Sequence, residues 1–504
     1  MSEPDYEVLI VGAGLSGIGM AIKLRKHGFT DFKILEKEQE FGGTWRDNVY
    51  PGITVDVPTV YYSFSFELNS EWSTFYAPQS ELLRYCLSCA TKYKLYDHVI
   101  FGVRVVEARF DAADALWYVS LADGSCLRAR YLISGTGLLS VPRWPDIPGI
   151  EGFGGVKMHT MHWDHSLDLT AKRVGFIGTG ATGVQVIPEV APTVGHLFVY
   201  QRTPTWIMPK PDRAIGPRLR WAMRHVPGFQ RVLRWMAIAL IDIPLWSILA
   251  STRKVLWLQR RIQVLCLRKL EREVRDPKIR AKLTPLFDFG CRRPTFSNKY
   301  LPAFNLPSVE LITAPIERIS AHSIVTQDGE EQSIDVLVCA TGFHVFTADT
   351  VPTFKVIGRE GVALSDYWAH EGHQSHRGVC VNNFPNYFMV FGPNSVSSLS
   401  YIQMIEASTD HIIKLLRRAR VLGADVVEVQ SEVQAREYRW VQRRAEETIW
   451  IQGDCGGSGG LRPGKASPVL RPNNTFTAWL AHLFVGTRGY RFTGQRRPCS
   501  ERRQ

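Results

Sequence analysis

The chain has 504 residues, 45% of them hydrophobic and 21% charged, a composition typical of globular proteins that excludes a fibrous or wholly disordered chain. Its length predicts several domains, and its formal net charge of +12 favours anionic partners, although no stretch interleaves basic and aromatic residues as nucleic-acid binding would require. The nine cysteines are scattered and the first residues carry no secretory pattern, so we expect a cytoplasmic protein without a disulfide framework.

Residues 7–36 have the pattern of a dinucleotide-binding unit, in which an apolar strand, a glycine-rich turn, a helix and a second strand follow one another. The turn contains G-x-G-x-x-G, at Gly12, Gly14 and Gly17. Such glycines let the backbone and the helix N-terminus approach a pyrophosphate. Glu36 ends the second strand, where a carboxylate accepts hydrogen bonds from ribose hydroxyls. This unit therefore predicts a site for FAD or NAD.

Two cysteines follow on a segment that is predicted to be helical, Ser80–Tyr93. Cys86 and Cys89 form a C-x-x-C pair, which beside a flavin could carry electrons to a disulfide. Their spacing also places them on the apolar face of the helix. We interpret them as core residues and keep a dithiol–disulfide reductase as the alternative.

The pattern of the first unit returns at residues 172–206. The second turn has its glycines at Gly178, Gly180 and Gly183. Nineteen residues after the last glycine of each turn, the first unit has Glu36 and the second has Arg202. An arginine suits the 2′-phosphate of NADPH, which a carboxylate would repel, and Thr203 adds a hydroxyl donor. A chain with an FAD unit and an NADPH unit is predicted to be a flavin-dependent oxidoreductase.

The segment 211–275 is rich in arginine and surrounds the longest apolar run, Trp235–Ala250. This run is short for a membrane span and contains Asp242 and Pro244. We interpret the segment as a helical insertion. Its flanking arginines make peripheral contact with an anionic membrane the alternative.

Four segments carry a family resemblance. The linker before the second unit has the pattern F-x-G-x-x-x-H-T-x-x-W-D, with Phe153, Gly155, His159, Trp163 and Asp164. The other three are GGTWRDNVYPGITVD, FGCRRPTFSNKYLPAFNLPSVEL and FPNYFMVFGPN. Over about residues 5–455 the chain resembles type I Baeyer–Villiger monooxygenases.

This resemblance implies an α/β fold with two dinucleotide-binding, Rossmann-like domains, one for FAD and one for NADPH. It implies that oxygen adds to the reduced flavin, and that the peroxyflavin attacks a ketone to give an ester or a lactone. Sulfur or nitrogen oxygenation, as in the flavin-containing monooxygenases, remains open, so the expected substrate is a small ketone or thioether. An inactive flavoprotein is a further alternative, and the oligomeric state is not predicted.

The resemblance also implies roles for individual residues. Arg293 would stabilise the peroxide and the oxyanion of its adduct, and Asp56 would pair with Arg293. Arg292 would contact the 2′-phosphate of NADPH, and Trp45 would lie beside the flavin. We interpret His159 as a hinge residue of the linker rather than a metal ligand, and we expect no metal site.

The layout follows from these motifs. We expect the FAD domain at 1–140 and 330–455, the NADPH domain at 141–210 and 281–329, a helical insertion at 211–280 and an atypical tail at 456–504. The tail is rich in glycine and then in arginine, which predicts a loosely ordered segment that departs from the family.

Overall fold

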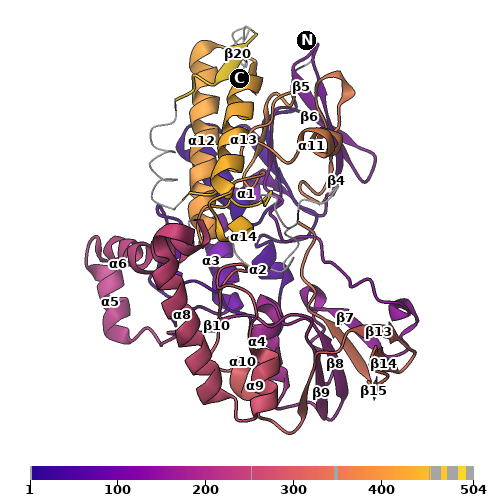
Figure 1. The fold of residues 1–504 in the computed structure, drawn as a ribbon. Helices are drawn as coiled ribbons and strands as arrows, with labels where there is room; N and C mark the ends of the chain where they lie inside the picture. The colour runs from indigo at the N-terminus through magenta and orange to yellow at the C-terminus, as the bar shows by residue number, and fades with distance from the viewer. Residues whose placement is uncertain are drawn as a thin grey trace.

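The computed structural model describes residues 3–250, 252–345, 350–452, 455, 467–473 and 486–494. Two sheets flanked by helices lie towards opposite ends of the molecule, and a group of helices projects from one side between them (Figure 1). This is the α/β architecture with two nucleotide-binding folds and a helical insertion that the sequence predicts.

The first sheet belongs to the predicted FAD domain. Its strands are β1 (Tyr6–Val11), β2 (Phe32–Leu35), β3 (Val99–Ile100), β4 (Val105–Asp111), β5 (Leu116–Leu121), β6 (Cys126–Ser134), β17 (Lys355–Ile357) and β18 (Tyr387–Met389). The strand order is β17-β4-β5-β6-β1-β2-β3, and β18 also pairs with β6. The central strand β1 runs parallel to β2 and β6, and its last four residues are apolar and buried, as expected for a parallel strand covered on both faces.

Helices surround this sheet and form most of the core. They are α1 (Leu15–Lys26), α2 (Thr44–Asp47), α3 (Gln79–Lys92), α11 (Leu364–Glu371), α12 (Tyr401–Leu422), α13 (Ser431–Ala445) and α14 (Ile449–Gln452). Helix α1 packs against α3 and α12. These contacts fix α1, and therefore the glycine turn before it, at the carboxyl end of β1.

The second sheet repeats the plan of the first. Its elements are β7 (Val156–His159), β8 (Arg173–Ile177), α4 (Ala181–Val190), β9 (His196–Tyr200), α10 (Tyr300–Ala303), β12 (Val309–Ile312) and β16 (Val336–Cys339). The strands are all parallel, in the order β12-β9-β8-β16-β7. An antiparallel sheet of β13 (Ile316–Ile319), β14 (Ser323–Thr326) and β15 (Glu331–Ser333) accompanies it.

One predicted boundary is wrong. The sequence places the return to the FAD domain at residue 330, yet β16 lies in the second sheet, between β7 and β8. The second segment of the NADPH domain therefore extends to about Ala340. An apolar strand that ends in a small-residue turn has the same pattern in either sheet, because the pairing partner is not encoded locally.

The chain crosses between the two sheets along two adjacent segments. Pro142 bridges Phe343, the Arg143 amide donates to the Gly342 carbonyl at 2.8 Å, and the His344 amide donates to the Val141 carbonyl at 2.9 Å. Because both connections lie side by side, the two domains share one narrow hinge region.

Helices fill the predicted insertion. They are α5 (Pro217–His225), α6 (Phe229–Ala237), the π-helix η5 (Ile238–Asp242), α7 (Ile243–Ala250), α8 (Thr252–Glu273) and α9 (Pro277–Leu283). Helix α8 packs against α10 and the short strand β10 (Ile207–Met208), which pairs with β11 (Thr295–Phe296). The insertion is thus anchored to the segment that carries Arg292 and Arg293.

Most of the predicted tail lies outside the described residues, but its two described pieces are held by the FAD domain. Strand β20 (Tyr490–Thr493) pairs antiparallel with β19 (Val426–Val429), and Arg471 forms an ion pair of 2.6 Å with the buried Glu437. A disulfide joins Cys291 to Cys455, the residue just before the tail, with a Cα–Cα distance of 5.2 Å. These pieces therefore belong to the packed structure.

Candidate active site

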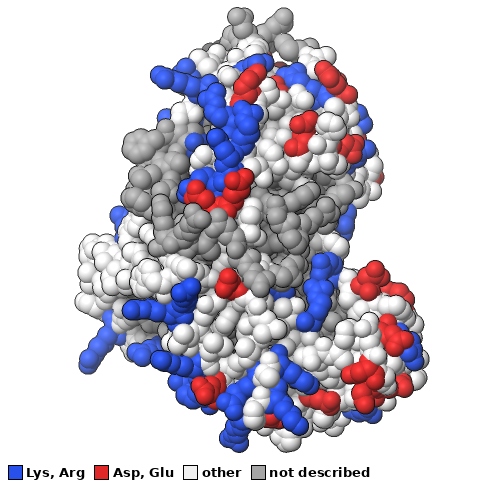
Figure 2. All heavy atoms as spheres, in the orientation of Figure 1, with Lys and Arg blue, Asp and Glu red and all other residues white. Residues whose placement is uncertain are grey.

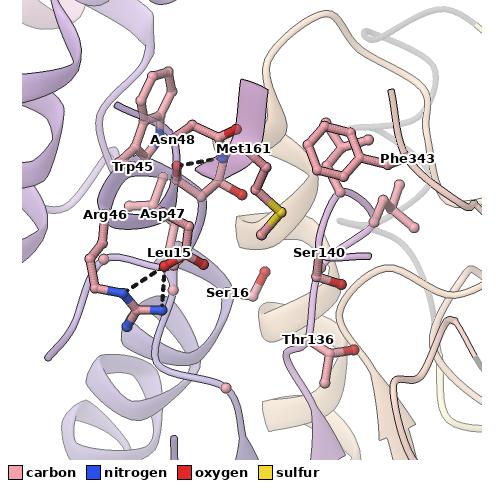
Figure 3. A pocket seen from close by; sticks show the side chains of 18 of the residues that line it. Leu15, Ser16, Trp45, Arg46, Asp47, Asn48, Thr136, Ser140, Met161 and Phe343 are labelled. Atoms are coloured by element: carbon pink, nitrogen blue, oxygen red, sulfur yellow. Dashed lines mark hydrogen bonds and ion pairs between the residues drawn. The ribbon is translucent and has the colours of Figure 1, made fainter. Parts of the chain in front are cut away.

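A cavity of about 610 Å³ lies at the carboxyl end of β1, between the first glycine turn and the segments that cross to the second domain. It is lined by six residues that the sequence singles out, namely Gly12, Gly14, Glu36, Trp45, Asp56 and Arg293. Figure 3 shows Leu15, Trp45 and Arg46 on one side, Ser140 and Phe343 on the other, and Met161 between them. Parallel sheets bind ligands at this end of their strands.

The first turn has the shape that a pyrophosphate requires. Gly12 has a φ of 104°, a conformation that only glycine adopts without strain. A Cβ on Gly17 would lie 1.9 Å from the Gly12 carbonyl oxygen, so this glycine lets α1 pack against the turn. The N-terminal amides of α1 then face the cavity, where an anion is stabilised.

Glu36 is buried at the end of β2, beside this turn. One carboxylate oxygen accepts from the Ala13 amide at 2.7 Å, and the other accepts from the Glu38 amide at 3.1 Å and lies 3.5 Å from Arg46. The backbone thus orients the carboxylate at the cavity wall, where a ribose can donate to it. Trp45 is also buried there and packs edge-on against Tyr62, with ring centroids 5.8 Å apart.

Arg293 and Asp56 form a bidentate pair, as the resemblance predicts. The Nε of Arg293 lies 2.9 Å from Oδ2 of Asp56, and Nη2 lies 3.1 Å from Oδ1. Nη2 also donates to the Leu399 carbonyl at 2.9 Å. Burial works against the charge, but Asp56 raises the pKa of Arg293 above its ordinary value. The guanidinium is therefore a permanent cation, and 34% of each side chain is still exposed to the cavity.

The second turn repeats the first. Gly178 has a φ of 113°, and a Cβ on Gly183 would lie 2.4 Å from the Gly178 carbonyl oxygen, whereas one on Gly180 would meet open space. Thr203, after β9, accepts from the Thr179 hydroxyl through its carbonyl at 3.3 Å. The second turn thus has the form of a second dinucleotide site, at the other sheet.

The two arginines assigned to NADPH come together from distant parts of the chain. Burial, and then the charge of Arg202, lower the pKa of Arg292. The buried Nε of Arg292 has no hydrogen-bond partner among the described residues. Two guanidinium groups that repel each other beside a dinucleotide turn fit an anion that binds between them, such as the 2′-phosphate of NADPH.

His159 lies at the crossing between the domains. Its Nδ1 accepts from the Met161 amide at 3.2 Å, and its ring packs edge-on against Trp144 and Phe343, one from each crossing segment. Burial, and to a smaller extent the charge of His162, lower its pKa, which favours the neutral ring. A hinge residue would need contacts of this kind with both crossing segments.

The other residues of the linker pattern have packing roles. Trp163 belongs to the core of the second domain, and Phe153 packs in a neighbouring cluster. Gly155 is required because a Cβ there would lie 2.4 Å from the Asp335 carbonyl oxygen. Asp164 accepts from the amide and the hydroxyl of Ser166, which closes a turn.

The three histidines of this segment diverge. His159 contacts the crossing segments, whereas His162 lines the cavity and His165 bonds to the Val49 carbonyl at 2.7 Å. Within the described parts of the chain, no group of three or more metal-ligating side chains is found. The three histidines therefore have separate contacts, and the hinge role of His159 stays a prediction.

The C-x-x-C pair is a poor redox centre. Cys86 and Cys89 are buried in the core along the inner face of α3, and neither is among the described residues that line the cavity. Burial raises the pKa of both thiols, that of Cys89 to about 12. Because the thiolate is the reactive form, this environment disfavours a dithiol–disulfide function.

Several residues of the site carry no sequence signal. The ring centroid of Tyr401, at the start of α12, lies 5.7 Å from Cζ of Arg293, and Leu399 supplies the carbonyl that Arg293 contacts. Gln185 on α4 accepts from the Tyr50 hydroxyl at 3.3 Å and donates to the Thr54 carbonyl at 3.1 Å. These residues join the domains through tertiary contacts alone.

Comparisons with known proteins agree with this geometry. Residues 9–227 match the pyridine nucleotide-disulphide oxidoreductase family. A Baeyer–Villiger monooxygenase of Pseudomonas aeruginosa is 37% identical, with 89% of this chain and 84% of that protein covered. One of Streptomyces coelicolor is 35% identical, with 89% and 85% covered. The chain belongs to the Baeyer–Villiger monooxygenase family.

Solved structures support this assignment. Cyclohexanone monooxygenase from Rhodococcus sp. Phi1 bound to NADP⁺ superposes with a TM-score of 0.87 at 28% identity, covering 98% of this chain and all of that one. The OTEMO complex with FAD and NADP gives 0.87 at 26% identity, with the same coverage. The predictions of the fold class, of a flavin-dependent NADPH monooxygenase and of FAD and NADPH as cofactors are confirmed.

Proposed function

We propose that this chain inserts one oxygen atom of O₂ next to the carbonyl of an organic ketone, giving an ester or a lactone. The observation that carries the proposal is the fixed cation Arg293, held by Asp56 in the cavity that the FAD-type turn lines. When bound, FAD supplies the activation of oxygen and NADPH supplies the electrons.

Arg293 would stabilise negative charge on oxygen during the reaction. Such a charge develops both on the attacking oxygen and on the carbonyl oxygen of the substrate, and a preorganised cation stabilises both. The bonds to Asp56 and Leu399 fix the guanidinium before the substrate arrives. No described residue accepts from Nη1, so its two protons remain for the reacting groups.

The residues that bind the cofactors would form two groups, one with a carboxylate for FAD and one with arginines for NADPH. The first turn and Glu36 would hold the pyrophosphate and a ribose of FAD, while Trp45 would pack near the flavin. The second turn, Thr203 and the pair Arg202–Arg292 would hold NADPH by its pyrophosphate and its 2′-phosphate.

The walls of the cavity suit an apolar ketone. They include Met161, Phe343, Phe391, Tyr401 and Ile405. A thioether fits the same walls, so oxygenation of sulfur is the second candidate activity. Cyclohexanone, for which the Rhodococcus enzyme is named, is of the size and polarity that such walls accept.

Isotope labelling would test the proposed reaction. The purified holoenzyme is incubated with NADPH, ¹⁸O₂ and a panel of cyclic and linear ketones, with one aryl thioether in parallel. We expect an ester or lactone with a single ¹⁸O atom and one molecule of NADPH consumed per ester. Hydrogen peroxide as the sole product, or a sulfoxide without any ester, would contradict the proposal.

His159 would couple the two domains, because it contacts both crossing segments. We expect His159→Ala to keep its FAD and its affinity for NADPH but to turn over more slowly. An unchanged kcat would remove the hinge role. A cytoplasmic location stays a prediction, and the oligomeric state stays open.

A further inference from the structure

The helical insertion contains a helix that buries two charged residues and exposes a row of apolar side chains. Along α6 and η5, Leu240 is 70% exposed, and Val232, Trp235 and Met236 are each at least 50% exposed. These residues recur at helical spacing and form one outward stripe, which we call the α6 stripe. A surface helix of a soluble protein usually has polar and charged residues on its outward face instead.

Two of the three charged residues along α6 and η5, Arg234 and Asp242, are buried and paired, whereas Arg231 is exposed. Arg234 donates to the Ser63 carbonyl at 2.5 Å and forms an ion pair of 3.0 Å with Glu406. Asp242 accepts from the Leu399 amide at 2.7 Å and from the Ser398 hydroxyl at 2.9 Å. The orientation of the helix is thus fixed by hydrogen bonds, and the stripe cannot turn inwards without breaking them.

Neighbouring helices extend the exposed apolar surface. Trp221 on α5 is 61% exposed and Trp257 on α8 is 59% exposed, and α5 and α8 contact α6 and α7 respectively. The guanidinium of Arg261 lies 5.3 Å from the Trp257 ring, so cation and aromatic group share one surface. Tryptophan beside arginine is typical of helices that lie at the interface of a bilayer.

The segment that carries this surface is strongly basic, although the exposed Glu71 pairs with Arg224 of α5 at 2.6 Å. Between Arg213 and Leu270 the chain has twelve basic residues and a single acidic one, Asp242, which is buried. Figure 2 shows the lobe of α5 and α6 almost without charged side chains on the viewed face, with Lys and Arg side chains below it. An apolar patch beside unbalanced positive charge is complementary to an anionic lipid surface.

We propose that the insertion docks on an anionic bilayer, with the α6 stripe in the interfacial layer and the arginines at the lipid phosphates. Residues 229–249 are long and apolar enough to span a membrane by length and composition. Their inner side is occupied by protein, however, since Arg234, Asp242 and Trp246 pack against the FAD domain and the described tail. The helix therefore lies on the membrane rather than across it.

Docking would place the bilayer close to the site of oxygenation. Asp242 binds the amide of Leu399, and the carbonyl of Leu399 binds Arg293. One residue thus separates the inner side of the docking helix from the cation of the cavity. Apolar ketones concentrate in lipid, so a docked enzyme would meet them at the membrane.

Vesicle flotation tests the proposal with the full-length, FAD-loaded protein. Vesicles of phosphatidylcholine alone are compared with vesicles that also contain phosphatidylglycerol, at low and at high salt. We expect flotation only with the anionic vesicles, and less of it at high salt because added ions screen the arginines. Equal recovery with both vesicles, or with neither, would overturn the proposal.

Matched variants locate the contact. The triple variant Trp235→Ser, Met236→Ser, Leu240→Ser removes three apolar side chains from the stripe and should reduce the bound fraction roughly tenfold or more. The control Val421→Ser, Leu422→Ser removes exposed apolar side chains at the far end of α12 and should float like the wild type. Both variants must retain FAD absorbance, which shows that they are folded.

A second copy of this chain is the competing occupant of the stripe. Light scattering measures the mass of the wild type and of the triple variant, and so distinguishes a second copy from a membrane as the occupant. If the wild type is a dimer, the triple variant is a monomer and the wild type does not float, the stripe binds a second copy and the membrane proposal is wrong. A wild type that floats and shows the same mass as the triple variant supports the membrane.

Discussion

The two glycine turns share one backbone and differ in the charge beside them. In both, the first glycine has a positive φ and the third lies against the carbonyl oxygen of the first. The FAD unit then presents the carboxylate of Glu36, oriented by two backbone amides. The NADPH unit presents Arg202 and Arg292, and burial, followed by the charge of Arg202, lowers the pKa of Arg292.

We propose that this difference lets one fold select between two dinucleotides. The turn recognises a pyrophosphate through backbone amides, which every dinucleotide satisfies equally. Selection comes from the side chains at the end of the second strand, where a carboxylate accepts from ribose hydroxyls and arginines attract a phosphate. Changes in the turn should therefore affect whether a dinucleotide binds, whereas changes in these side chains should affect which dinucleotide binds.

The largest expected effect is that of Gly17→Ala. Its Cβ would lie 1.9 Å from the Gly12 carbonyl oxygen, so α1 must move away from the turn. We expect loss of bound FAD and of activity, measured by flavin absorbance after purification. Gly180→Ala, in the other turn, is the control for FAD content alone, because a Cβ there meets no atom within 4 Å. A Gly17→Ala protein with full FAD content would contradict the claim that the first turn needs a glycine at this position to bind FAD.

A smaller effect should follow Arg202→Ala. Loss of a charge-assisted bond to the 2′-phosphate costs about 1.5–3 kcal/mol, which raises the KM for NADPH roughly 10- to 150-fold. The KM for NADH, which has no such phosphate, should stay nearly constant. An equal rise for both nucleotides would mean that Arg202 supports the fold rather than the phosphate.

The smallest effect of this series should be that of Glu36→Gln. The substitution keeps the shape and one acceptor oxygen but replaces a charged acceptor with a neutral one. We expect the Kd for FAD to rise roughly tenfold, since a bond to a charged group is about twice as strong as a neutral one. NADPH affinity should not change, and titration of the apoprotein with FAD measures the difference.

Much of this organisation was predictable from local patterns. Both turns, Glu36 and Arg202 follow from strand, glycine and charge spacing, because a βαβ unit is encoded within about 35 contiguous residues. The pairing of Asp56 with Arg293 was predicted from family motifs, and the structure brings these two residues together across 237 positions.

The remaining features depend on contacts between distant segments. The predicted boundary between the NADPH domain and the second FAD segment, at residue 330, was wrong because the local sequence of β16 does not determine which sheet the strand joins. The bridge between Cys291 and Cys455 spans 164 residues and could not be read from the spacing of scattered cysteines. The α6 stripe is apolar in sequence, but only Arg234 and Asp242 in their buried positions show which side faces outwards.

The most direct test of the role of Arg293 is to compare the products that Arg293→Ala and Arg293→Lys form for each NADPH consumed. NADPH oxidation, hydrogen peroxide and ester are quantified together, with FAD content as the control for folding. The account predicts that Arg293→Ala still oxidises NADPH but releases peroxide in place of ester, with partial recovery in Arg293→Lys. Ester formation per NADPH equal to the wild type in Arg293→Ala would contradict the central role of this cation.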